Sequence, residues 1–160
     1  MKKGILPCMH LISTNNVCKL IFFVLSFANY SCNNRVNNQT KLFKKYMQKE
    51  FRVNLGTKKE FYFIVPSSGC IGCNKVVATR FSSDKKRENN CYIIITKKAL
   101  KNLGNIQINN QNVFIDENNT IESLDIDLLN TSLIIWENDR IQKIEILTPE
   151  NTFSIVFGLP

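Results

Sequence analysis

The sequence contains little of several residues on which common chemistries depend. Histidine occurs once among 160 residues, as His10 near the N-terminus. A zinc site needs about four ligands, so no metal site is predicted. Without a partner histidine and a nucleophile elbow, the pattern supports neither hydrolase nor glycosidase chemistry. No organic cofactor is indicated.

Acidic residues are also scarce relative to basic ones. The 13 acidic residues stand against 21 basic residues, which gives a formal net charge of +8. The basic residues form no stripe interleaved with aromatic side chains, and no nucleic-acid-binding motif is present. Asn, Lys and Ile are abundant throughout, which indicates compositional bias. We therefore predict no nucleic-acid partner.

The first 32 residues differ in character from the rest of the chain. Lys2, Lys3 and Lys19 are their only charged residues, and an apolar run follows over 20–27. Small and polar residues then lead to Cys32. This order is typical of an export signal. The apolar run is shorter than the roughly 20 residues that span a membrane.

The same segment resembles a bacterial lipoprotein signal, in which the cysteine at the cut becomes the lipidated first residue. The resemblance implies an export and lipoprotein signal over 1–32, lipidation at Cys32 and a polar tether over 33–40. It also implies a lipid anchor to a membrane at the cell envelope, facing the periplasm or the exterior. A cleaved signal, an uncleaved anchor helix and a buried helix are the alternatives. An exported chain would face an oxidising compartment, where disulfides form.

Residues 41–160 are predicted to form one α/β domain. A run of apolar residues over 61–65, stopped by Pro66, predicts a strand buried on both faces. The order of strands and helices, followed by a terminal hairpin, predicts a mixed sheet. We expect helices over 41–51 (capped by Thr40), 70–81, 97–103, 121–129 and 149–157, and further strands over 91–96, 113–116, 133–136 and 141–147.

The strongest local signal is the pair Cys70 and Cys73, between the predicted strand over 61–65 and its helix. The thiolate is the attacking species in disulfide exchange. Unpaired N–H groups and the helix dipole favour a negative sulfur at Cys70. Cys73 lies one helical turn further, from which it can attack a mixed disulfide at Cys70. The spacing predicts a redox-active pair, with a structural disulfide and half of a metal site as alternatives.

The buried strand, its turn, the Cys-x-x-Cys helix and the later strands resemble the thioredoxin fold, most closely that of exported membrane-anchored redoxins. The resemblance covers roughly residues 51–147. It implies a thioredoxin-like three-layer α/β fold, with a central mixed β-sheet and a C-terminal β-hairpin. It also implies that Cys70 is the nucleophile and Cys73 the resolving thiol, that protein thiols or disulfides are the partners, and that the protein is a monomer.

Three positions depart from that family's pattern. Gly69 precedes the first cysteine, where an aromatic residue is usual, and Ile64 stands where many members have a buried acid. Thr131 or Ser132 stands where the family has a cis-proline before the fourth strand. For Cys91, a small buried side chain is favoured over a third redox thiol.

The predicted function is therefore that of an exported thiol–disulfide oxidoreductase in which Cys70 attacks and Cys73 resolves. The alternative is a non-catalytic, thioredoxin-like binding lipoprotein of the cell envelope. The acid missing at Ile64 and the missing proline favour this alternative.

Overall fold

The computed structural model of the chain describes residues 35–82, 90–104, 106, 108, 112–124, 126 and 128–159. The predicted signal, Cys32 and the first two residues of the predicted tether lie outside the described residues. The chain divides into two units, Met1–Arg35 and Val36–Pro160, and the fold below is that of the second unit. Within the described part, no helix has the length and apolar character needed to cross a membrane.

The strand β1 (Glu60–Val65) lies at the centre of a five-stranded sheet with the order β3-β2-β1-β4-β5. On one side, β2 (Cys91–Thr96) runs parallel to β1, and β3 (Val113–Asp116) runs parallel to β2. On the other side, β4 (Ser132–Glu137) is antiparallel to β1, and β5 (Arg140–Ile146) is antiparallel to β4. The predicted α/β fold with a mixed sheet is confirmed.

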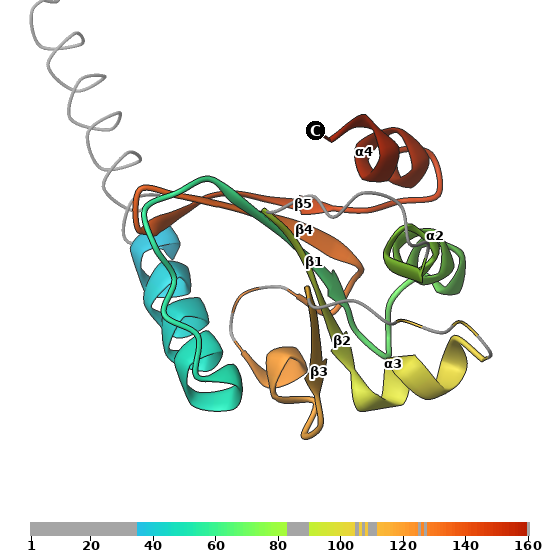
Figure 1. Cartoon of the computed structure of the whole chain (residues 1–160), viewed down its shortest axis with the longest axis horizontal. Coiled ribbons are helices and arrows are strands. Elements are labelled where there is room, and N and C mark those ends of the chain that lie inside the picture. The colour runs from blue at the N-terminus through green and yellow to red at the C-terminus, as the bar shows by residue number, and fades with distance from the viewer. Residues whose placement is uncertain are drawn as a thin grey trace, which may run out of the picture. The chain divides into compact units, whose positions relative to one another are not determined.

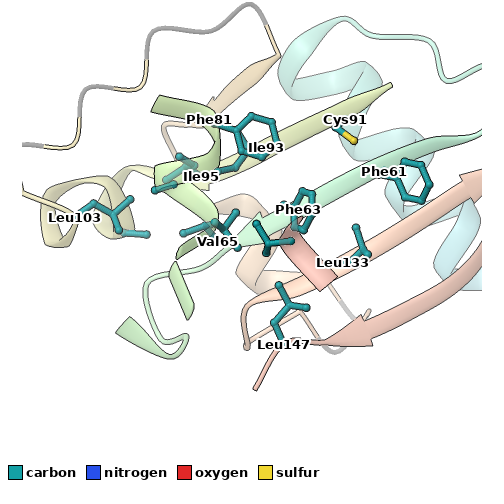
Figure 2. Packing of buried hydrophobic residues seen from close by; sticks show 14 residues of the cluster. Phe61, Phe63, Val65, Phe81, Cys91, Ile93, Ile95, Leu103, Leu133 and Leu147 are labelled. Atoms are coloured by element: carbon teal, nitrogen blue, oxygen red, sulfur yellow. The ribbon is translucent and has the colours of Figure 1, made fainter. Parts of the chain in front are cut away.

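Both faces of β1 are covered, as its continuous apolar run predicts. On one face, Phe61, Phe63 and Val65 pack against residues of three helices (Figure 2). These helices are α2 (Ile71–Ser82), α3 (Lys97–Asn102) and α4 (Thr152–Gly158). On the other face, Tyr62 and Ile64 share a core with Phe43, Tyr46 and Met47. These three residues belong to the helix over residues 35–51, which covers that side of the sheet (Figure 1). Alternate side chains of a strand point to opposite faces, so the two cores share one strand.

The helix over residues 35–51 begins before the predicted start at 41, and residues 35–40 of the predicted tether are helical. The Thr40 hydroxyl does not cap this helix. It accepts a hydrogen bond from the Ile141 N–H at 3.2 Å, on strand β5. The polar residues before Thr40 have modest helix propensity and no apolar periodicity. The sequence pattern therefore does not reveal the extension.

The predicted helix over 121–129 is wrong beyond its first turn. Among the described residues of this stretch, the structure has only the 3₁₀ helix η1 (Thr120–Ser123). Ile126 and Leu128 are both buried and lie in turns. The other predicted elements lie at the expected places, with small shifts at their ends.

Replacing Phe43 tests the packing of the helix over 35–51 on the sheet. Phe43 has no exposed surface, whereas Val36 on the same helix is 36% exposed. We expect Phe43→Ala to lower the free energy of unfolding in urea by about 3–5 kcal/mol, because it leaves a cavity. We expect Val36→Ala to change it by about 0.5 kcal/mol or less. Equal effects of the two substitutions would show that this helix does not cover the sheet.

Candidate functional site

The two predicted site cysteines lie together at the junction of β1 and α2. The sheet strand ends at Val65, a turn follows Pro66, and α2 begins at Ile71. Cys70 is half-buried directly before the helix, and Cys73 is buried in its first turn. The backbone N–H of Cys73 donates a hydrogen bond to Cys70 Sγ at 3.2 Å. Both side chains are thiols in this structure.

The surroundings shift the two thiols in opposite directions. The pKa of Cys70 is lowered, mainly by a hydrogen bond with the Cys73 thiol and also by the Cys73 backbone N–H. Burial is the main cause that raises the pKa of Cys73, and the bond with Cys70 adds to it. At neutral pH the negative charge of the pair is therefore favoured on the more accessible sulfur, Cys70. A nucleophilic thiol and a resolving thiol need this difference in pKa and in exposure.

The beginning of α4 also borders the pair. A hydrogen bond with the Thr152 side chain acts to lower the pKa of Cys73, against the stronger effect of burial. The negative charge of Glu150 acts to raise the pKa of Cys70. Sequence reasoning missed both residues. They lie almost 80 positions away from the pair, and no local pattern marks them.

Gly69 lies against Thr131 on the segment that precedes β4. A Cβ atom at Gly69 would lie 2.7 Å from Thr131 Oγ1 and 3.0 Å from the Thr131 backbone nitrogen. Such distances are shorter than van der Waals contact, so a larger side chain does not fit unless Thr131 moves. The contact explains why this chain has glycine where the resemblance leads one to expect an aromatic residue.

Cys91 lies away from the candidate site. It opens β2 and pairs in register with Phe61, near the start of β1, whereas Cys70 follows the end of β1. Figure 2 shows Cys91 among the buried residues beside Phe61. The side chain is 2% exposed. The structure therefore does not bring Cys91 together with Cys70 and Cys73.

The described residues contain no cluster of three or more His, Cys, Asp or Glu side chains that could hold a metal ion. Comparisons of the chain with protein-family models, with curated proteins and with solved structures find no match. The interpretation of the site therefore depends on its own geometry and chemistry.

The opposite pKa shifts predict selective alkylation at Cys70. We expect iodoacetamide at pH 7 to modify Cys70 before Cys73 and Cys91, because only thiolates react and the other two side chains are buried. The rate at Cys70 should rise with pH to a midpoint below about 8.5, the value of an ordinary cysteine. Peptide mass spectrometry after timed quenching measures each site. Faster modification of Cys73 would contradict the assignment of roles.

Proposed function

We propose that this chain is a thiol–disulfide oxidoreductase with a thioredoxin-like fold. The observation that carries the proposal is the placement of Cys70 directly before α2, with the Cys73 N–H 3.2 Å from its sulfur. Backbone N–H groups at a helix start stabilise negative charge. A second thiol one turn along the same helix is placed to complete an exchange.

The sheet topology supports the thioredoxin-like assignment. The strand before the cysteine pair, β1, has the parallel strand β2 on one side and the antiparallel strand β4 on the other. The strand β5 follows as the antiparallel neighbour of β4. The helices α2 and α4 pack on the same face of this sheet (Figure 1). The resemblance in sequence was based on the order of the strands, the Cys-x-x-Cys helix and the terminal hairpin along the chain, and this topology is compatible with it.

In the proposed reaction, the Cys70 thiolate attacks one sulfur of a substrate disulfide. The substrate S–S bond breaks, a mixed disulfide forms, and the released substrate thiolate takes a proton from water. Cys73 then attacks Cys70 Sγ and gives its proton, through water, to the second substrate sulfur. The mixed disulfide breaks, a Cys70–Cys73 disulfide forms, and the second substrate thiol is released. The substrate gains two electrons, which the pair loses. The same steps in reverse oxidise a substrate dithiol.

Exposed apolar side chains beside the pair support protein substrates rather than small molecules. Ile71 follows Cys70 in the chain and is 60% exposed. Leu129 is 57% exposed, and its carbonyl accepts the Ser68 hydroxyl of the turn at 2.7 Å. Phe153 follows Thr152 and is 68% exposed. Apolar surface of this kind is stabilised by contact with another polypeptide.

One observation favours the alternative, a non-catalytic binding role of the same fold. Ile64, where many members of the thioredoxin-like family have a buried acid, is fully buried on β1 and provides no base for the Cys73 proton. With a raised pKa at Cys73, resolution of a mixed disulfide is slower than in a site that contains such a base. A protein that uses the pair only as a structural disulfide would not need the base.

Serine substitutions separate the two functions. We expect the reduced wild-type protein to reduce insulin disulfides, and Cys70→Ser to lower the rate to that of the reductant alone, because the nucleophile is lost. Cys73→Ser should accumulate mixed disulfides at Cys70, since resolution is blocked. Cys91→Ala is the matched control and should keep the wild-type rate. Full activity of Cys70→Ser would exclude the oxidoreductase.

We also propose that the protein is exported and anchored by a lipid at Cys32. The basic start, the apolar run and the cysteine followed by polar residues support this proposal. We expect protein purified from membranes to begin at Cys32 and to carry acyl chains there, as measured by intact-mass spectrometry. Cys32→Ser should abolish the acylation. An unmodified Cys32 or an intact signal on the mature protein would contradict the anchor.

A further inference from the structure

A buried network of polar side chains lies directly behind the turn that carries Cys70. Thr131 has no exposed surface, and its hydroxyl donates a hydrogen bond to Asn74 Oδ1 at 2.6 Å. Asn74 is 5% exposed, and its Nδ2 donates to the Pro66 carbonyl at 3.2 Å. The network joins the end of β1, the helix α2 and the segment before β4. Burying polar groups destabilises a protein unless they are paired, and apolar residues of similar shape avoid that requirement.

The Pro66 carbonyl fixes the direction of every bond in this network. A carbonyl oxygen only accepts, so the Nδ2 group of Asn74 has to face Pro66. The Asn74 Oδ1 atom then faces Thr131, whose hydroxyl has to donate. A reversed amide would set two oxygens against each other at Pro66. The three groups therefore have one arrangement that satisfies all of them.

Asn74 is hydrogen-bonded to both ends of the turn, at Pro66 and at Cys70. In addition to the bond from its side chain to Pro66, its backbone N–H donates to the Cys70 carbonyl at 2.9 Å. The segment between Pro66 and Cys70 therefore has a fixed span. Thr131 also contacts the middle of that segment, since Gly69 lies against its hydroxyl and backbone nitrogen.

The segment that carries Thr131 is itself anchored. The Thr131 carbonyl accepts a hydrogen bond from the Leu147 N–H at 2.8 Å. Leu147 is buried in the same core as Val65, the last residue of β1. Thr131 is therefore held against the sheet through Leu147. Its hydrogen bond to Asn74 links it to the turn that carries Cys70.

We infer that Asn74 and Thr131 are positioning residues of the redox site, which hold the turn so that Cys70 Sγ stays within 3.2 Å of the Cys73 N–H. The inference rests on the proposed function. In this role neither residue touches the reacting sulfur or transfers a proton. Their effect reaches Cys70 through the backbone of the turn.

Substitution of the Thr131 hydroxyl tests this inference. Thr131→Val removes the hydroxyl with little change of shape, and Thr131→Ser retains it. Thr96→Val is the matched control, because Thr96 is also fully buried and its hydroxyl accepts from the Ala99 N–H at 3.2 Å, outside the network. The measurement is the alkylation rate of Cys70 against pH in the full-length protein. The reduction potential of the pair is measured in parallel.

We expect Thr131→Val to slow alkylation of Cys70 at pH 7 by at least about threefold, which corresponds to a pKa rise of about half a unit. Thr131→Ser and Thr96→Val should keep the wild-type pH profile, even though Thr96→Val also loses a buried hydrogen bond. Asn74→Ala breaks the network from the helix side and should reproduce the effect of Thr131→Val. The test therefore does not depend on the folding of a single variant.

Unchanged Cys70 profiles in both Thr131→Val and Asn74→Ala would overturn the inference and leave the network a purely structural role. The proposed function fails by a different result. If Cys70 and Cys73 of the wild type form no reversible disulfide, the oxidoreductase is excluded whatever the alkylation profiles of the variants show.

Discussion

Coverage of β1 on both faces is the constraint on which the rest of this structure depends. Phe63 and Ile64, on opposite faces of β1, have no exposed surface. A strand held between two cores has neither a free face nor a free register, so the position of its last residue is fixed. Val65 ends the strand, and the turn after Pro66 brings Cys70 to the start of α2. The geometry of the cysteine pair is a consequence of this burial.

The parts of the fold that sequence reasoning predicted are those with a strong local signal. Strands buried on both faces keep the apolar run over 61–65 and the isoleucines at 93–95 away from water. Both strands are present. The helix over 35–51 was predicted too short, because the residues before Thr40 have no apolar periodicity and Thr40 itself bonds to the distant strand β5. The helix over 121–129 was predicted in error beyond its first turn, because the local pattern did not separate a helix from the turns that the structure has at Ile126 and Leu128.

In the candidate site, too, the residues with a local sequence signal were predicted and those joined by distant contacts were not. Cys70 and Cys73 were predicted because the chemistry and the helix geometry lie within four consecutive residues. Asn74 and Thr131 are 57 positions apart, and their hydrogen bond exists only once β4 has paired with β1. Thr131 was noticed only as a position without proline. Its contact with Gly69 links two of the departures from the family's pattern, since the threonine occupies the space that a side chain at position 69 would need.

In the proposed function, Cys70 and Cys73 gain and lose two electrons together, as one pair. The most direct measurement is an equilibrium titration in glutathione buffers of graded potential, followed by alkylation and peptide mass spectrometry. We expect a single two-electron transition in which both thiols disappear together into one Cys70–Cys73 disulfide, while Cys91 remains alkylatable after unfolding. Thiols at 70 and 73 that persist at every potential, or that bond to other cysteines instead, would contradict the proposed function.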